Sequence, residues 1–159
     1  MVSGLAMLMA AVDQLIKWQL VRHFFLGESA VLVPRLLDLT YRQNPHAAFS
    51  LLQSLPPAAL LAITLVVLVL FSVLIWPYLR TRGGIAAAGL VYGGALGNLI
   101  DRIRLHYVID YLDFHVWPVF NLADASVVVG IGVLMLCIIR TDHARQHSTG
   151  GQPRETHPA

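Results

Sequence analysis

Two aspartates lie at the edges of long apolar segments, where an ionisable side chain is costly unless it serves a function. Asp110 is embedded in the sequence Val-Ile-Asp-Tyr, and Asp124 ends the sequence Phe-Asn-Leu-Ala-Asp directly before a new apolar stretch. Two carboxyl groups at one site share a proton, so that one serves as an acid while the other serves as a base. The pair therefore predicts acid–base chemistry at the edge of a membrane.

A structural alternative exists for Asp124, because Asn121 and Asp124 have the spacing of a capping box. Asparagine is a good N-cap, and an acid three residues later suits the positive end of a helix. Asp113 is a rival to Asp110, three residues away, and we interpret it as a solvated loop acid.

Five other polar side chains lie in or at the ends of apolar segments. Asp13 and Lys17 are four residues apart in the favoured order for an ion pair, which indicates a structural role. Asp101 and Arg102 either form an ion pair that locks helix packing or orient nearby catalytic groups, and we favour a structural support role for both. Asn98 shares a helix face with Asp101, and it either locks helix packing or orients catalytic groups.

The composition is that of an integral membrane protein. Of the 159 residues, 57% are hydrophobic and 13% are charged, whereas a soluble domain carries about 25% charged residues. The net charge of +2 without a basic cluster argues against nucleic-acid binding. Four segments approach the roughly 20 apolar residues needed to span a bilayer; they are residues 4–21, 58–78, 84–103 and 121–139.

The connections complete an all-α membrane fold with four transmembrane helices. Residues 37–41 alternate with a period of two, which predicts a small extramembrane β-sheet between helices 1 and 2. The aromatic segment 104–119 suits the membrane interface. Residues 1–140 form one catalytic domain, and the polar tail 141–159 is predicted to be disordered. The distribution of arginines favours cytoplasmic termini.

Small residues recur every four positions in the third segment, at Gly89, Gly93 and Gly97, and this pattern predicts close helix packing. The seven histidines follow no metal-binding pattern, so that we expect no metal. No Gly-x-Ser-x-Gly turn supports a serine nucleophile. Cys137, the single cysteine, is interpreted as a small packing residue.

Five motifs together resemble the bacterial lipoprotein signal peptidase family, also called signal peptidase II. They are Asp13-x-x-x-Lys17, Asn44-x-x-Ala47-Ala48-Phe49, Gly97-Asn98-x-x-Asp101-Arg102, Val108-Ile109-Asp110-Tyr111 and Phe120-Asn121-Leu122-Ala123-Asp124. They occur in the order and spacing of that family and cover nearly the whole chain before the tail. His46 stands where the family usually has glycine.

The resemblance implies an intramembrane aspartic endopeptidase that needs no cofactor. It implies that the enzyme cleaves prolipoproteins just before a cysteine that carries a diacylglyceryl group. Asp110 and Asp124 match the catalytic aspartates of the family. The matching supporting residues are Asp13, Lys17, Asn44, Asn98, Asp101, Arg102 and Asn121.

The resemblance also implies a setting. We expect a multi-pass protein of the bacterial cytoplasmic (inner) membrane that contacts membrane lipids, with its active site near the outer, periplasmic face. Nothing in the sequence requires more than a monomer. The alternatives are a small proton-coupled transporter, since buried acids also relay protons, and a structural assembly factor that docks through its glycines.

Overall fold

The computed structural model describes residues 1–45 and 56–149. His46 and the motif residues Ala47, Ala48 and Phe49 lie outside these ranges, as do residues 150–159. The helices are α1 (Val2–His23), α2 (Pro57–Ile75), α3 (Arg82–Leu105) and α4 (Leu122–Thr149), and a 3-10 turn, Trp76–Tyr78, follows α2. The strands are β1 (Ser29–Val33), β2 (Leu37–Asn44) and β3 (Val108–Asp113).

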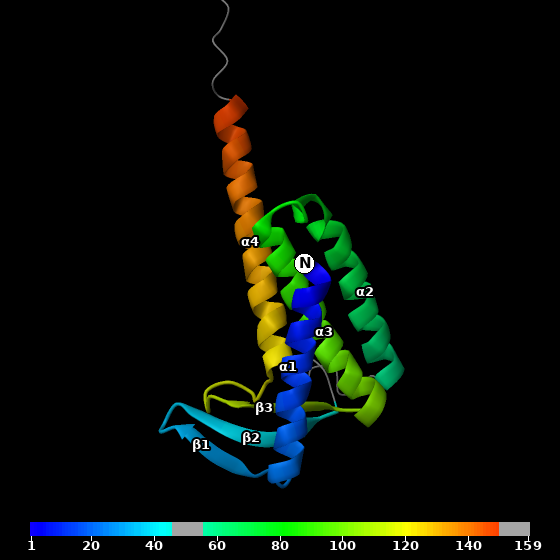
Figure 1. Ribbon diagram of the computed structural model, residues 1–159, viewed down its shortest axis with the longest axis vertical. Coiled ribbons are helices and arrows are strands. Elements are labelled where there is room, and N and C mark those ends of the chain that lie inside the picture. The colour runs from blue at the N-terminus through cyan, green and yellow to red at the C-terminus, as the bar shows by residue number, and fades with distance from the viewer. Residues whose placement is uncertain (46–55, 150–159) are drawn as a thin grey trace, which may run out of the picture.

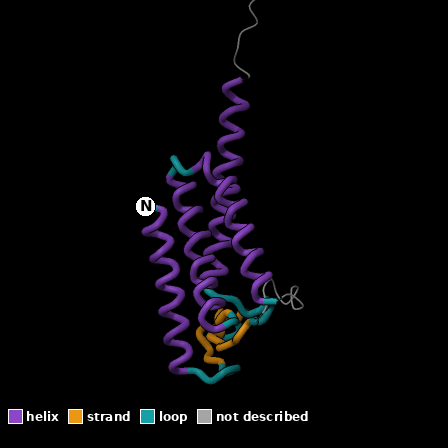
Figure 2. The backbone as a smooth tube through the Cα atoms, turned by 90° about the vertical axis from the view of Figure 1, so that its right-hand side faces the viewer, coloured by secondary structure: helices purple, strands orange, loops and turns teal. Residues whose placement is uncertain are grey.

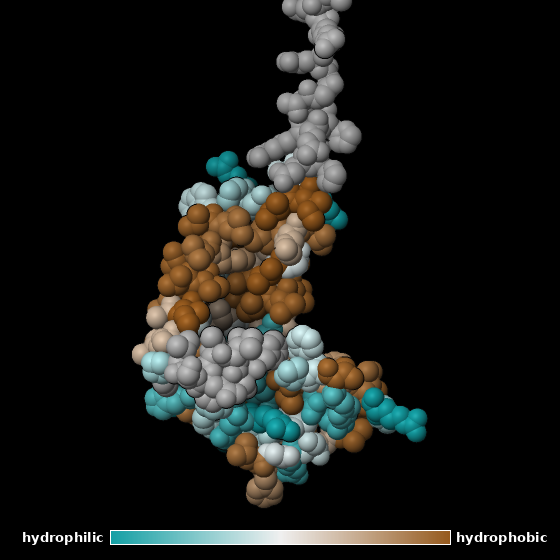
Figure 3. Space-filling model, turned by 180° about the vertical axis from the view of Figure 1, so that it is seen from behind, coloured by the Kyte–Doolittle hydropathy of each residue, from teal (hydrophilic) through white to brown (hydrophobic). Residues whose placement is uncertain are grey.

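The four helices are long and apolar enough to cross a membrane, which confirms the four predicted spans. They run side by side, with the sheet at one end and the α2–α3 connection at the other (Figures 1 and 2). Apolar side chains cover the helical part of the surface, and polar ones gather around the sheet (Figure 3). The helical bundle thus has an apolar surface suited to lipid, and the end that carries the sheet is polar.

Local signals explain where the helices begin and end. Pro57 starts α2, where its missing N–H is one that the helix does not use. Thr81 caps α3 by accepting a hydrogen bond from the backbone N–H of Gly84 at 2.9 Å. α3 ends at His106, which adopts a left-handed conformation with φ of 65°.

α3 is the central helix, and glycines let its neighbours approach closely. A Cβ added at Gly93 would lie 2.7 Å from the carbonyl oxygen of Ala6 in α1, and one added at Gly89 would lie 2.7 Å from Leu5. A Cβ added at Gly97 would lie 2.9 Å from Oδ2 of Asp13. The predicted packing role of the three glycines is therefore confirmed.

The sheet has the order β1-β2-β3 with antiparallel neighbours. The predicted strand over residues 37–41 is confirmed within β2. In the pairing with β3, Thr40 and Tyr41 together stand opposite Tyr111 between the Leu39–Leu112 and Arg42–Asp110 pairs. Such a bulge bends a strand and redirects its side chains.

Two elements differ from the sequence expectation. The segment 104–119, predicted as an interfacial loop, contains β3, so that the sheet also draws a strand from between α3 and α4. β3 has no clear alternation, because four consecutive residues, 108–111, are buried. In addition, α4 continues as a helix over residues 141–149 of the segment predicted to be a disordered tail.

Candidate active site

Asp110 lies in the middle of β3, and its side chain is only 3% exposed. Its Oδ2 accepts a hydrogen bond from Nδ2 of Asn44 at 2.9 Å, and its Oδ1 accepts one from Nδ2 of Asn121 at 2.7 Å. Burial, and then the nearby charge of Asp124, raise the pKa of Asp110 to about 7, against the lowering effect of these two hydrogen bonds and of Lys17. Asp110 can therefore hold a proton near neutral pH.

Asp124 lies in the first turn of α4 and takes part in the predicted capping box. Oδ1 of Asn121 accepts a hydrogen bond from the backbone N–H of Asp124 at 2.8 Å, and Oδ2 of Asp124 accepts one from the backbone N–H of Asn121 at 3.3 Å. Oδ1 of Asp124 accepts a further hydrogen bond from Nδ2 of Asn98 at 2.7 Å. The capping interpretation is thus confirmed, and it leaves an oxygen of Asp124 for contacts beyond the cap.

Asn121 connects the two carboxyl groups. Its Oδ1 caps α4 at Asp124, while its Nδ2 lies 2.7 Å from Oδ1 of Asp110 and 3.1 Å from Oδ1 of Asn98. The side chain is fully buried. One amide therefore fixes the acid of β3 relative to the first turn of α4.

Both carboxyl groups line the same cavity, which has a volume of about 760 Å³. Arg102 and Asn44 supply its other polar groups. The remaining lining is apolar and comes from the loop before α4 and from the first turns of α4. Two of these side chains, Phe114 and Phe120, stack with ring centroids 5.8 Å apart. The cavity thus combines two acids with walls suited to apolar chains.

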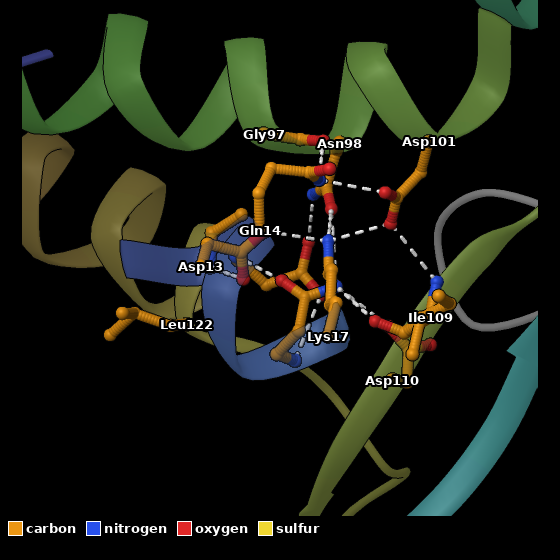
Figure 4. Close-up of polar contacts among 12 residues, drawn as sticks. Asp13, Gln14, Lys17, Gly97, Asn98, Asp101, Ile109, Asp110 and Leu122 are labelled. Atoms are coloured by element: carbon orange, nitrogen blue, oxygen red, sulfur yellow. Dashed lines mark hydrogen bonds and ion pairs between the residues drawn. The ribbon is translucent and has the colours of Figure 1, made fainter. Parts of the chain in front are cut away.

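Lys17 is the centre of a buried polar network (Figure 4). Its Nζ lies 2.7 Å from Oδ2 of Asp13 and 2.7 Å from Oδ2 of Asp101, and it donates to Oδ1 of Asn98 at 3.2 Å. The expected Asp13–Lys17 pair is therefore present, and the network continues to Asp124 through Asn98. Buried charges of this kind require such pairing.

An ion pair between Asp101 and Arg102, one of the two interpretations of these residues, is not found among the described side chains. In the described part of the chain the ion pair of Asp101 is with Lys17 of α1, whereas Arg102 lines the cavity. Consecutive residues of a helix point about 100° apart, so that the two side chains face different neighbours. Asp101 also accepts a hydrogen bond from the backbone N–H of Ile109 at 3.2 Å.

Asp13 ties α1 to the other elements. Its Oδ1 accepts hydrogen bonds from the backbone N–H of Ala123 at 3.1 Å and from the hydroxyl of Tyr111 at 3.3 Å. Burial raises the pKa of Tyr111, and the charge of Asp13 adds to this effect, so that the hydroxyl keeps its proton. Asp13 therefore positions the start of α4 and the strand that carries Asp110.

Asp113, the rival acid, is not the solvated loop acid expected from the sequence, because it belongs to strand β3 and is partly buried. It lies at the end of β3 with its side chain 20% exposed, and it accepts a hydrogen bond from the backbone N–H of His115 at 2.9 Å. It does not line the cavity that holds the other two acids. Among the side chains that the structure describes, which end at Thr141, no three from His, Cys, Asp or Glu come together in a way that could hold a metal ion.

The sequence reasoning missed Gln14. Its Nε2 donates hydrogen bonds to the carbonyl oxygen of Gly97 at 3.0 Å and to Oδ1 of Asp101 at 2.7 Å. A neutral polar residue next to Asp13 inside an apolar span was the available signal, because such a side chain needs partners in a membrane.

Comparison with known proteins identifies relatives of the same size. The family described as signal peptidase (SPase) II matches residues 5–140. A lipoprotein signal peptidase of Halothermothrix orenii is 45% identical over 139 residues, covering 86% of this chain and 93% of that protein. A lipoprotein signal peptidase of Streptococcus pyogenes is 40% identical, covering 82% of this chain and 88% of that protein.

The fold also matches solved structures. A bacterial membrane enzyme determined by the in meso method at 1.9 Å resolution superposes with a TM-score of 0.71 and 26% identity, covering 84% of this chain and 89% of that chain. A second such structure, at 2.3 Å resolution, gives a TM-score of 0.76 at 24% identity over 96% of this chain and 92% of that chain, and it shows the fold alone.

Proposed function

The chain belongs to the signal peptidase II family, and we propose that Asp110 and Asp124 are the catalytic pair of this aspartic intramembrane protease. The enzyme removes signal peptides from prolipoproteins, as the names of its relatives imply. The observation that carries the proposal is that the two buried acids, from β3 and α4, line one cavity and are joined through Asn121.

The mechanism follows from the different surroundings of the two acids. Asp110, with a pKa of about 7, holds the proton and donates a hydrogen bond to the oxygen of the scissile carbonyl. Asp124, whose carboxylate accepts hydrogen bonds from Asn98 and from the backbone of Asn121, takes a proton from water. The water oxygen then bonds to the carbonyl carbon while the proton of Asp110 moves to the carbonyl oxygen, so that the tetrahedral intermediate carries two hydroxyl groups.

Collapse of this intermediate breaks the C–N bond. The proton taken from water passes from Asp124 to the leaving amine, and Asp110 recovers its own proton from the tetrahedral hydroxyl. The cycle consumes one water and leaves the pair with the single shared proton with which it began. The reaction therefore needs no cofactor.

The supporting residues hold this arrangement. Asn44, Asn98 and Asn121 donate to the acids directly. Asp13, Lys17 and Asp101 form the buried network behind them. Arg102 supplies a positive charge at the cavity, where the acids lie. We assign it to contacts with polar groups of the substrate.

The substrate is a prolipoprotein whose cysteine carries a diacylglyceryl group, and cleavage falls just before that cysteine. The support for this choice is the lining of the cavity, in which Phe114, Trp117 and Phe120 face a run of valines, residues 127–129. Such walls suit acyl chains and an apolar signal peptide, while the acids provide a small polar centre.

The four apolar helices make this a multi-pass membrane protein. We place it in the bacterial cytoplasmic (inner) membrane with cytoplasmic termini, the active site near the periplasmic face, and a monomer as the working unit. Arg80, Arg82 and Arg140 support this orientation, because they lie at the end of the bundle opposite the sheet (Figure 1). Cysteines introduced at Arg80 and Ser29, in a Cys137→Ser background, should react with an impermeant reagent from opposite sides.

The decisive experiment incubates purified protein in detergent with a diacylglyceryl-modified precursor and reads the fragment masses. Asp110→Asn and Asp124→Asn should each abolish cleavage while leaving membrane insertion intact. Asp113→Asn is the matched control from the same strand and should cleave normally. Normal cleavage by either of the first two variants contradicts the assignment, and proton flux without cleavage would indicate the transporter alternative.

A further inference from the structure

Gln14 lies on α1, away from the cavity, and its side chain points at α3 between Gly97 and Asp101 (Figure 4). Its Nε2 donates to the carbonyl oxygen of Gly97 and, at 2.7 Å, to Oδ1 of Asp101. We propose that Gln14 is a positioning residue for the catalytic pair, acting through the carboxyl group of Asp101. This inference rests on the proposed function of Asp110 and Asp124.

Asp101 is connected to the two catalytic acids by two chains of contacts. Its Oδ2 accepts a hydrogen bond from the backbone N–H of Ile109, the residue directly before Asp110 in β3. The same oxygen lies 2.7 Å from Nζ of Lys17, which in turn donates to Oδ1 of Asn98. Asn98 then donates to Asp124 at 2.7 Å. The carboxyl group of Asp101 therefore fixes the backbone next to Asp110 and, through Lys17, the Asn98 amide that donates to Asp124.

The amide of Gln14 decides which oxygen of Asp101 faces which partner. Because Gln14 occupies Oδ1 from the α1 side, Oδ2 is left to bridge Lys17 and Ile109. The bond to the Gly97 carbonyl anchors the amide itself to α3. The absence of a side chain on Gly97 allows this close approach of α1, because an added Cβ would lie 2.9 Å from Oδ2 of Asp13.

The neutrality of Gln14 matters as well, because the cluster is densely charged. The charged and titratable groups of this network are Asp13 and Lys17 from α1, Asp101 and Arg102 from α3, Asp110 and Tyr111 from β3, and Asp124 from α4. A carboxylate at position 14 would lie next to Asp101 and force the two acids to share a proton or repel. Either outcome displaces Oδ2 of Asp101, which contacts the backbone N–H of Ile109 and Nζ of Lys17.

The test uses two substitutions of similar size, in the full-length protein and with the lipid-modified precursor. Gln14→Met removes the donor, and Gln14→Glu replaces it with an acceptor. We expect each to lower kcat about tenfold or more, with KM within about twofold, because Gln14 does not line the cavity. Gln14→Glu should also raise the midpoint of the alkaline limb of the kcat profile, since its charge favours the protonated form of Asp110.

A double variant that exchanges the amide and the carboxyl group distinguishes a positioning role of Gln14 from a general loss of structure. In Gln14→Glu/Asp101→Asn, the new amide at position 101 donates to the new carboxylate at position 14, while the amide oxygen still accepts from Lys17 and Ile109. We expect at least a fivefold recovery of kcat over Gln14→Glu alone. Gln19 is an exposed glutamine on the same helix, so that Gln19→Met and Gln19→Glu are matched controls and should behave as wild type.

Rates are expressed per folded molecule, with the folded fraction taken from thermal unfolding and size-exclusion chromatography. Wild-type kcat in both Gln14 variants, or no recovery in the double variant, overturns the inference. That result leaves the proposed function standing as long as Asp110→Asn and Asp124→Asn remain inactive. Cleavage by those two variants overturns the proposed function instead.

Discussion

The raised pKa of Asp110 has a consequence for stability that can be measured without substrate. An acid with a pKa of 3.8 in the unfolded chain and about 7 in the folded protein binds more protons when folded between these two values. The contribution of Asp110 to stability is therefore greatest below pH 4, falls as the pH rises, and is constant again above the folded pKa. At about 1.4 kcal/mol per tenfold change in proton affinity, the loss reaches roughly 4 kcal/mol.

Asp110→Asn should remove this pH dependence, because an amide resembles the protonated carboxyl group and does not ionise. For a chain of this size, roughly 4 kcal/mol corresponds to a shift of about 8–16 °C in the unfolding midpoint. The unfolding midpoints of wild type and Asp110→Asn are measured by tryptophan fluorescence in the same detergent, from pH 4 to pH 8.5. The wild-type midpoint should fall relative to that of Asp110→Asn by this amount as the pH rises.

Asp124→Asn provides the internal check. The charge of Asp124 is the second cause of the raised pKa, after burial. Its removal should lower the pKa of Asp110 and reduce the pH dependence without abolishing it. Parallel curves for wild type and Asp110→Asn would refute the reasoning, because they would mean that Asp110 binds its proton equally well in the folded and unfolded chain.

Further substitutions test the packing, the cap and the cavity. Gly93→Ala should cost about 1–3 kcal/mol of stability by pushing α1 off α3, whereas Gly132→Ala, which meets nothing within 4 Å, should not destabilise in the same melting assay. Asn121→Ser keeps an N-cap but lacks the amide that donates to Asp110, so that the rate of cleavage should fall at least tenfold. Asn121→Ala also lacks the cap, and its free energy of unfolding should be about 1 kcal/mol lower than that of Asn121→Ser. Phe114→Ala removes one wall of the cavity and should raise KM for the lipid-modified precursor about fivefold, equivalent to ~1 kcal/mol of binding; an unchanged KM would place the acyl chains elsewhere.

The transmembrane helices and the capping box were predictable because their signals are local. Runs of apolar residues define the spans, and Asn121 with Asp124 has the spacing that a helix start requires. The glycine pattern in α3 is local as well, and it identified the face on which α1 packs. Each of these features depends on residues within a single helix or at its start.

The features that were missed depend on contacts between distant segments. β3 exists because it pairs with β2, about 70 residues earlier in the chain, and its own residues are too uniformly buried to show alternation. The partner of Asp101 is Lys17, 84 residues away, rather than the adjacent arginine. Gln14 finds its partners only when α1 packs against α3. No window of neighbouring residues contains this information.

The chemistry of the site depends on which groups touch the acids and which are kept one step away. Asn44, Asn98 and Asn121 reach the two carboxyl groups with neutral amides. A lysine in direct contact would stabilise the ionised form and deprive the pair of its proton. Instead Lys17 is bound by two acids of its own and donates to Asn98 rather than to the pair, so that its charge lowers the pKa of Asp110 without direct contact. Neutral amides in direct contact, with Lys17 held one step away, let the two buried carboxyl groups retain a single proton near neutral pH, while Arg102 supplies a positive charge to the cavity lining.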